Sequence, residues 1–397
     1  MIKIENIKRF IILILPSLVF IFQFINIGSI HLSWGIYLLL GIILIMENKR
    51  AVNMEIALFV FIALLVPIIT FTYSSTNKFN LTLYFSITTG CLVMIYIFLL
   101  TEKEFYYFMD GIFISCILYA AIGLVEMLTG QFLFEHDSKQ IMMISDAGTH
   151  YPISAFTNSS DLAQYLALMF PISAVHFCSK CGLNNKNKMV FLFFSGFIFF
   201  IIERASSNLA IISMICCYIF FGGVVILVKR KLSTIKIAMF IFVGLIISLY
   251  IVNKYSNFIP RIMENIFVTR TNVHYTIRAD IYSQIIDMSI QHPFGGFGNA
   301  YSVFDPHNLI LYIFCDYGLL IGILFVFVIV DFIIVFFDYF LKSGSEEYLM
   351  LTSILMVFPL LSSISSGNEQ RKAIYFFIGI CMNMRYRLKR QRLNNQL

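Results

Sequence analysis

The residues best suited to chemistry lie between Arg278 and Gly322, where an otherwise apolar chain gathers arginine, histidine, glycine and acidic side chains. The segment reads RADIYSQIIDMSIQHPFGGFG from residue 278 and PHNLILYIFCDYG from residue 306. A guanidinium group binds phosphate oxygens through two parallel hydrogen bonds and stays charged at any relevant pH. An imidazole can accept a proton from a hydroxyl group near pH 7. These residue types can bind an anionic group and transfer a proton, so the chemistry of the protein is expected here.

His307 is either an ordinary hydrogen-bonded histidine at the membrane interface or, because of its polar neighbours, the leading candidate for a general base. It follows Pro306, which suits the first turn of a helix, and Asn308 places an amide beside it. A carboxylate could orient the histidine or accept the proton instead, and the sequence does not choose among three of them: Asp161, Asp305 and Asp316.

An amphipathic helix is predicted in the first part of this segment. Ile281, Ile285 and Met288 recur at helical spacing on one side, and the other side is polar: Asp280, Ser283, Gln284 and Asp287. Such a helix lies on the membrane or on the helix bundle. It should stop at His292-Pro293, because the residue before a proline resists the helical conformation. Three glycines then permit a close-approaching, irregular backbone: Gly295, Gly296 and Gly298.

Arg204 interrupts about 40 nearly continuous apolar residues between Met189 and Lys229. Arginine in hydrocarbon costs about 2.5–3.5 kcal/mol on insertion scales. The side chain could reach the headgroups or pair with Glu203, or it could be a fixed cation that receives an anionic ligand. Two further arginines, Arg261 and Arg270, are either additional phosphate contacts or solvated loop charges.

The composition indicates a polytopic, all-α membrane protein. Hydrophobic residues make up 59% of the chain, charged residues 13%, and the mean hydropathy is +0.85. Apolar runs long enough to cross about 30 Å of hydrocarbon predict about twelve spans. They are 10–27, 30–46, 54–72, 82–100, 109–128, 162–178, 189–202, 207–228, 237–252, 318–340, 349–365 and 373–384.

Most of the 28 Lys and Arg residues fall on one side if both termini face the cytoplasm. The net charge of +6 then reports anchoring to the inner leaflet, and no nucleic acid is expected as a partner. The two long connections, about 129–161 and 253–317, would both lie outside, so catalysis is expected at the outer face. No cleavable signal is evident, and residues 1–397 are predicted to form a single integral membrane domain.

No metal or disulfide framework is predicted. The eight cysteines sit mainly within spans, where cysteine behaves as a small apolar residue. Cys178-x-x-Cys181 lies near His176, but a second pair is missing, and the outer histidines are scattered without ligand spacing.

These residues resemble the O-antigen polymerase and O-antigen ligase superfamily of bacterial surface-polysaccharide enzymes. Three stretches carry the likeness: ISAFTNSSDLAQYL over 153–166 with Pro171 beyond it, RASS over 204–207, and the segment from Arg278 to Leu319 with HPFGGFG, PHN and DYGL. The order of the stretches and their placement against the spans match. Glu203 stands where a serine often precedes the arginine, and Asp316 stands where glutamate is common.

The resemblance implies a fold similar to that of the membrane-embedded, lipid-dependent glycosyltransferases (GT-C-like). It implies a glycan carried on undecaprenyl diphosphate and a mechanism without a metal or other cofactor. Arg204 and Arg278 would grip the diphosphate, with Arg270 and Arg261 as further contacts, and His307 with Asp316 would assist the acceptor hydroxyl. The glycan and the loop around it are assigned to Asn158, Asp161, Gly296, Gly298 and Asn308.

The expected function is therefore a polysaccharide polymerase for O-antigen or capsule repeat units, in the bacterial cytoplasmic membrane with both termini inside. It would transfer the growing glycan from undecaprenyl diphosphate to the next lipid-linked repeat. The alternatives are a ligase that transfers polymer to a separate acceptor and a flippase for lipid-linked oligosaccharides. A chain-length regulator and the flippase of the same pathway are the expected protein partners.

Overall fold

The computed structural model describes residues 4–21, 26–27, 30–31, 81–134, 150–156, 158–181, 185–205, 207–229, 283–294, 296, 308–362 and 368–394. The chain forms two compact units. Unit 1 comprises Met1–Ser17, Phe108–Tyr275 and Ile333–Ile364, and unit 2 comprises Leu18–Tyr107, Thr276–Phe332 and Ser365–Leu397. The single membrane domain expected over residues 1–397 stays a prediction.

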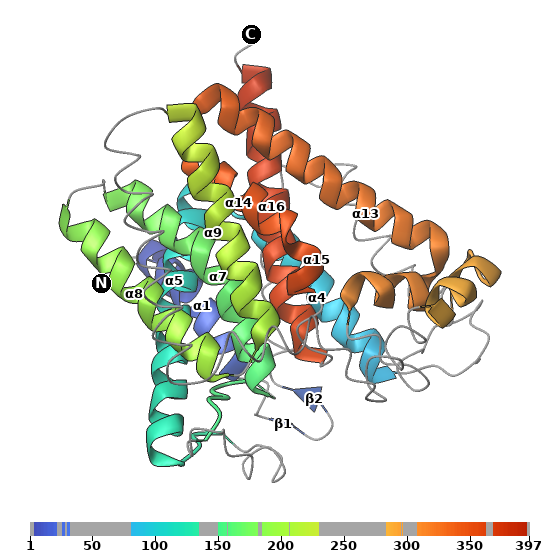
Figure 1. Ribbon diagram of the computed structural model, residues 1–397, viewed down its shortest axis with the longest axis horizontal. Coiled ribbons are helices and arrows are strands. Elements are labelled where there is room, and N and C mark those ends of the chain that lie inside the picture. The colour runs from blue at the N-terminus through green and yellow to red at the C-terminus, as the bar shows by residue number, and fades with distance from the viewer. Residues whose placement is uncertain are drawn as a thin grey trace, which may run out of the picture. The chain divides into compact units, whose positions relative to one another are not determined.

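The described residues are helical almost throughout, which confirms the all-α class (Figure 1). The helices are α1 (Ile4–Ile21), α4 (Leu81–Leu99), α5 (Glu102–Thr129), α7 (Ser159–Cys181), α8 (Asn185–Arg204), α9 (Asn208–Lys229), a helix over residues 283–291, α13 (Leu309–Ser343), α14 (Glu346–Met356), α15 (Phe358–Leu361) and α16 (Asn368–Asn394). The strands β1 (Asn26–Ile27) and β2 (Ile30–His31) pair antiparallel, with Asn26 opposite His31.

Four helices in the described part of the chain are long and apolar enough to cross a membrane. They are Glu102–Thr129, Ser159–Lys180, Leu209–Val228 and Tyr317–Ser343. This number fits a multi-pass membrane protein. The expected spans 54–72 and 237–252 and residues 32–46 of the expected span 30–46 lie outside the described residues, while Ile30 and His31 form β2 rather than helix. The count of twelve stays a prediction.

The apolar stretch 349–365 is not one continuous span. It breaks at Val357 into α14 and α15, and Val357 has φ −97° and ψ 4°. Pro359 explains the break, because proline has no N–H to donate and its ring crowds the carbonyl four residues earlier. The prediction of one uninterrupted span over 349–365 was therefore wrong, because proline interrupts helical hydrogen bonds whatever the hydropathy around it.

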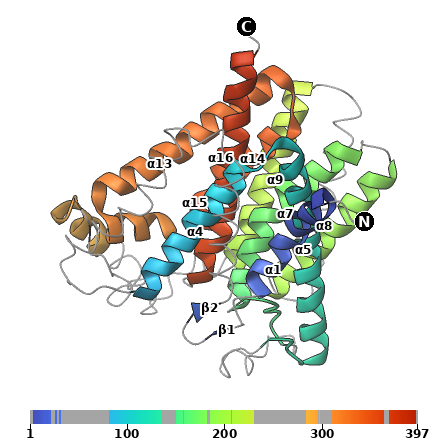
Figure 2. The ribbon, with the colours of Figure 1, turned by 180° about the vertical axis from the view of Figure 1, so that it is seen from behind.

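The core of unit 1 is α7, which packs against α8, α9 and α14 (Figure 2). Buried residues make up 89% of its most apolar window. The Tyr165 hydroxyl on α7 lies 2.6 Å from the Ser115 hydroxyl on α5, so the two helices are joined by a buried polar contact. Gly111 on α5 meets the backbone of Leu13 on α1 where a side chain would not fit. Such close approach at a small residue is how helices pack when the surroundings are apolar.

Unit 2 is organised around α4 and α16, which pack along their lengths. Gly379 on α16 would place a Cβ only 3.1 Å from Ile97 on α4, so glycine again permits the close contact. The Asn383 amide, buried on α16, donates through Nδ2 to the carbonyls of Ile97, Phe98 and Leu100 at 2.8–3.0 Å. These carbonyls belong to the end of α4, where helical partners run out. Asn383 therefore caps α4 from a neighbouring helix.

The beginning of α5 also belongs to unit 2. The Glu104 carboxyl group accepts hydrogen bonds from the backbone and the hydroxyl of Thr101, at 2.9 and 2.8 Å, which is a variant of the capping-box pattern. Arg387 on α16 donates to the Thr101 carbonyl at 3.2 Å and stacks 4.4 Å from the Phe105 ring centroid. The basic end of α16 is thus fixed to the start of α5.

Candidate functional site

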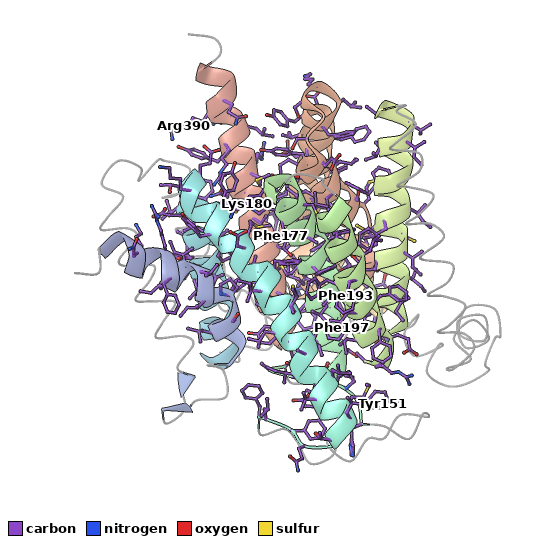
Figure 3. The ribbon with its side chains drawn as sticks, turned by 90° about the vertical axis from the view of Figure 1, so that its left-hand side faces the viewer. Tyr151, Phe177, Lys180, Phe193, Phe197 and Arg390 are labelled. Carbon is purple, nitrogen blue, oxygen red and sulfur yellow. The ribbon has the colours of Figure 1, made fainter. Side chains whose placement is uncertain are left out.

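Several polar residues that the sequence predicts to be functional lie at one end of unit 1. Short connections join α7 to α8 and α8 to α9, so consecutive helices run antiparallel, and Arg204 at the end of α8 shares an end of the unit with the start of α7. Lys180, at the other end of α7, lies far from Tyr151, as Figure 3 shows. We call this region, comprising the end of α5, residues 150–158, the start of α7 and Arg204, the Arg204 end.

The loop before α7 is held by a buried acidic residue of α5. Glu126 is fully buried, and its Oε2 accepts hydrogen bonds from the backbone N–H groups of Ile153 at 3.0 Å and Ser154 at 2.6 Å. Ser154 has φ 56°, in the left-handed region that non-glycine residues rarely adopt. Successive N–H groups that converge in such a turn form a concave anion-binding site. Here the protein's own carboxyl group occupies that site.

Aromatic packing fixes the rest of this loop. The Phe156 ring lies 5.3 Å from Tyr119 on α5 and 5.4 Å from Tyr165 on α7, measured between ring centroids. Gly123 on α5 leaves room for Pro152, since a Cβ there would lie 2.9 Å from the proline side chain. The loop is therefore packed against both α5 and α7 just before α7 begins.

Asn158 and Asp161, both predicted glycan contacts, form the start of α7. The Asn158 side-chain oxygen accepts the N–H of Asp161 at 2.8 Å, so Asn158 is the N-cap of the helix. Asp161 lies in the first turn, where negative charge is favoured, and is 2% exposed. One turn further, Gln164 donates to the Leu361 carbonyl at 2.6 Å. Asn158 and Gln164 therefore each form a hydrogen bond with a backbone group of the protein.

Arg204 is the cation of this region. Its side chain is 21% exposed and that of Glu203 is 8% exposed, with 3.2 Å between Arg204 Nε and Glu203 Oε2. Nε is nonetheless without an aligned hydrogen-bond acceptor among the described residues. The guanidinium carbon lies 5.3 Å from the Phe200 ring centroid. A largely buried guanidinium thus has one imperfectly aligned carboxylate and one aromatic ring as its neighbours in the described part of the chain.

Three other buried polar atoms at this end are without a hydrogen-bond partner in the regions that the structure describes. They are Glu126 Oε1, the Ser154 hydroxyl and Gln164 Oε1. Buried polar groups in proteins are nearly always paired with protein or with ordered water. These atoms and Arg204 Nε keep hydrogen-bonding capacity that ordered water could satisfy.

The second predicted motif lies in unit 2, where the HPFGGFG and DYG stretches meet. The helix over 283–291 ends before Pro293, with the His292 N–H bonded to the Met288 carbonyl at 2.9 Å, as predicted. Within α13, Gly318 has φ 85° and ψ 171°, which kinks the helix. A Cβ at Gly318 would lie 2.8 Å from the carbonyl oxygens of both His292 and Pro293. The turn and the kink therefore fit together only with glycine.

Asn308 is the N-cap of α13. Its side-chain oxygen accepts the N–H groups of Ile310 and Leu311 at 2.9 and 3.1 Å. The helix begins at Leu309, two residues after His307, where the sequence predicted its start. Gly296 is buried with φ 53°. Asp316 lies within α13, but its side chain and five other predicted site residues are outside the described residues: Arg261, Arg270, Arg278, Gly298 and His307.

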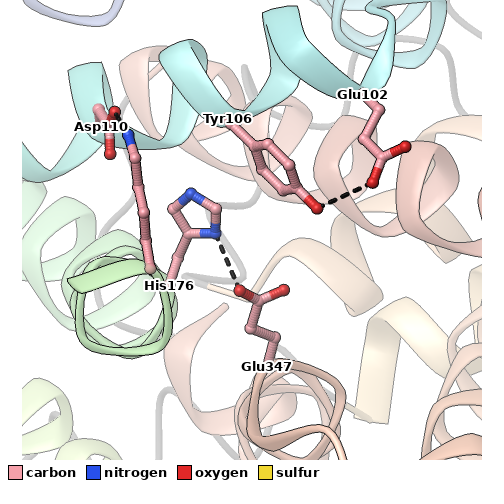
Figure 4. Close-up of polar contacts among 6 residues, drawn as sticks. Glu102, Tyr106, Asp110, His176 and Glu347 are labelled. Atoms are coloured by element: carbon pink, nitrogen blue, oxygen red, sulfur yellow. Dashed lines mark hydrogen bonds and ion pairs between the residues drawn. The ribbon is translucent and has the colours of Figure 1, made fainter. Parts of the chain in front are cut away.

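A second polar cluster lies at the opposite end of unit 1 (Figure 4). His176 Nδ1 on α7 is 2.9 Å from Glu347 Oε1 on α14, and Lys180 Nζ is 2.5 Å from Asp110 Oδ2 on α5. These pairs tie three helices together. In the described part of the chain no three His, Cys, Asp or Glu side chains are grouped to hold a metal ion.

Comparison of the chain with protein-family models and with curated protein sequences found no match. The resemblance to the O-antigen polymerase and ligase superfamily therefore rests on the residue patterns alone. What that resemblance implies about substrate and reaction belongs to the proposal that follows.

Proposed function

We propose that the protein is a polysaccharide polymerase that joins lipid-linked oligosaccharide repeats at the outer face of the bacterial cytoplasmic membrane. The bond between the anomeric carbon of the growing glycan and its undecaprenyl diphosphate breaks. A glycosidic bond to a hydroxyl group of the next lipid-linked repeat forms. The hydroxyl proton passes to His307 or to a carboxylate such as Asp316, and undecaprenyl diphosphate leaves.

The environment of Arg204 is the observation that carries this proposal. An arginine at the end of an apolar helix is costly to keep unless it has a function there. Its partner Glu203 is poorly aligned, which leaves Nε able to donate a hydrogen bond. A diphosphate offers several anionic oxygens, and a guanidinium binds such oxygens with paired hydrogen bonds. Fixed cations of this kind stabilise the charge that develops on a leaving diphosphate.

The surrounding polar atoms support a substrate that is itself polar. Glu126, Ser154 and Gln164 each keep a buried oxygen without a partner in the described regions. Sugar hydroxyl groups donate and accept hydrogen bonds and would satisfy such oxygens. Asn158 and Asp161 lie at the start of α7 beside them. In this proposal, Arg204 binds the diphosphate and the start of α7 lies along the attached sugar.

Arg278 is proposed as the second diphosphate ligand, with Arg270 and Arg261 as further contacts. Two guanidinium groups would replace the divalent cation that neutralises a diphosphate in many other enzymes. Gly296, Gly298 and Asn308 are proposed to shape the loop over the glycan. The lipid bilayer holds the polyprenyl tail, and a chain-length regulator and a flippase are proposed as partners.

A flippase is the alternative from another class, and local ion pairs weigh against it. Such a transporter needs polar groups that move with the substrate near the membrane midplane. Asp110 is paired with Lys180, Asp331 with Arg385 and Asp338 with Lys342, at 2.5–2.8 Å. Glu126 holds backbone N–H groups. Each of these four acidic residues thus has a local partner. A ligase shares the proposed chemistry and differs only in its acceptor.

The test is incubation of purified protein with one defined undecaprenyl-diphosphate-linked repeat, with and without a chelator. A polymerase uses the same lipid as donor and acceptor, so a ladder of products should form in both conditions. A ligase would need a separate acceptor before any product appeared, and a flippase would form no glycosidic bond. Activity that is lost with chelator and restored by a divalent ion would contradict metal independence.

A further inference from the structure

The helix over residues 283–291 has two apolar faces rather than the one expected. Ile285 and Ser289 are buried, and Ile285 packs with Cys315 and Leu311 of α13. This face holds the helix against the first part of α13. It accounts for only part of the apolar surface that the helix presents.

The second apolar face is exposed. Ile286 is 51% exposed, Ile290 is 59% exposed, and Phe294 in the following turn is 71% exposed. With about 100° of rotation per residue, Ile286 and Ile290 lie beside the buried face, and the opposite sector is exposed and polar. That sector consists of Ser283, Gln284, Asp287 and Gln291. The helix therefore has a protein-facing, an apolar exposed and a polar exposed sector.

The exposed apolar face continues onto α13. The Pro293 carbonyl accepts the Leu320 N–H at 3.3 Å, which places the turn containing Phe294 against the beginning of the long apolar part of α13. Leu320, Leu324 and Phe327 are exposed there at helical spacing. Only 22% of the apolar window of this candidate span is buried. An apolar helix surface of this length that is exposed in the described part of the chain is suited to contact lipid.

We propose that residues 283–294 lie in the membrane interface, with Ile286, Ile290 and Phe294 inserted among the lipid acyl chains and Gln284 and Asp287 in water. The occupant of the exposed apolar face is the bilayer, because that face is continuous with the lipid-facing surface of α13. An interfacial helix of this kind inserts its apolar side about 5–10 Å into the boundary between headgroups and acyl chains. The membrane then fixes the depth of the HPFGG turn. The inference does not depend on the proposed glycosyl transfer.

Tryptophan fluorescence in lipid vesicles tests this placement without any activity measurement. The chain has one tryptophan, Trp34, so a Trp34→Phe protein provides a background. Single probes are introduced as Ile290→Trp and Phe294→Trp on the apolar face, with Gln284→Trp and Asp287→Trp as matched controls on the polar face. Each protein is reconstituted into phosphatidylcholine vesicles whose acyl chains carry bromine either near the glycerol or near the terminal methyl group.

Bromine near the glycerol should quench the two apolar-face probes about threefold more strongly than the two controls, as expected for insertion at the acyl boundary. Bromine near the terminal methyl group should quench them less. Equal quenching of all four probes would overturn the proposal, as would the absence of quenching at both apolar positions. Phe294→Trp replaces one exposed aromatic ring by another, so it keeps the test informative even if Ile290→Trp does not fold.

Discussion

Removing the Glu126 carboxyl group should open the loop before α7. In Glu126→Ala, the backbone N–H groups of Ile153 and Ser154 lose their acceptor while the residues around them remain buried. Leaving a buried donor unsatisfied costs about 1–3 kcal/mol, so two of them cost about 2–6 kcal/mol. Ser154 adds to this, because its left-handed φ is maintained by these contacts.

Hydrogen–deuterium exchange over residues 150–158 measures this effect directly. Since about 1.4 kcal/mol corresponds to a factor of ten, even the lower bound predicts exchange roughly 30-fold faster at these amides. Glu126→Gln keeps a side-chain carbonyl oxygen and should exchange much more slowly than Glu126→Ala. Glu102→Ala, at an exposed position of the same helix, is the control and should leave the loop unchanged. Unaltered protection of residues 150–158 in Glu126→Ala would refute the role assigned to this carboxyl group.

Three further outcomes are expected. Gly318→Ala should lower the free energy of unfolding by about 1–3 kcal/mol from its backbone conformation alone, and the clash with the carbonyls of His292 and Pro293 should add to that cost. Hydrogen–deuterium exchange over residues 288–294 should become faster, and unchanged exchange there would contradict the described fit of turn and kink. Asn383→Ala removes the side-chain donor that the Ile97, Phe98 and Leu100 carbonyls share, and it should lower the thermal unfolding temperature in detergent, at a cost of about 1–3 kcal/mol. His307→Ala should bind the lipid-linked repeat normally yet form no product, because proton transfer acts only in the transition state; product formation at the normal rate would remove this residue from the mechanism.

Hydropathy was sufficient to predict the helical class and several boundaries. The turn between α8 and α9 falls at Arg204, and the helix before Pro293 ends where the proline required. These features are local, because apolar length and proline chemistry act within a few residues of themselves. Hydropathy did not predict the helix break within 349–365, because Pro359 lies in an apolar stretch whose hydropathy does not register the loss of a backbone N–H.

The side-chain partners could not be predicted in the same way. Glu126 binds amides 27 and 28 residues further along the chain, and Asn383 caps a helix that ends 283–286 residues earlier. Such groups meet only because helices distant in the sequence pack together, and these contacts cannot be predicted from the spacing of residues along the chain. A signal did exist at Glu126, since a carboxyl group near the end of an apolar helix needs a partner. Asn308 was predicted as a polar contact, and its role as a helix cap follows from its position before Leu309.

Formation of a product ladder by Arg204 variants tests the central claim most directly. With one undecaprenyl-diphosphate-linked repeat as sole substrate, the unaltered protein should produce the ladder and Arg204→Ala should not. Arg204→Lys should recover little activity, because an ammonium group cannot form the paired hydrogen bonds of a guanidinium. Glu203→Gln should retain the ladder, since it removes only a competing negative charge. A ladder from Arg204→Ala equal to that of the unaltered protein would contradict the assignment of this arginine to the diphosphate.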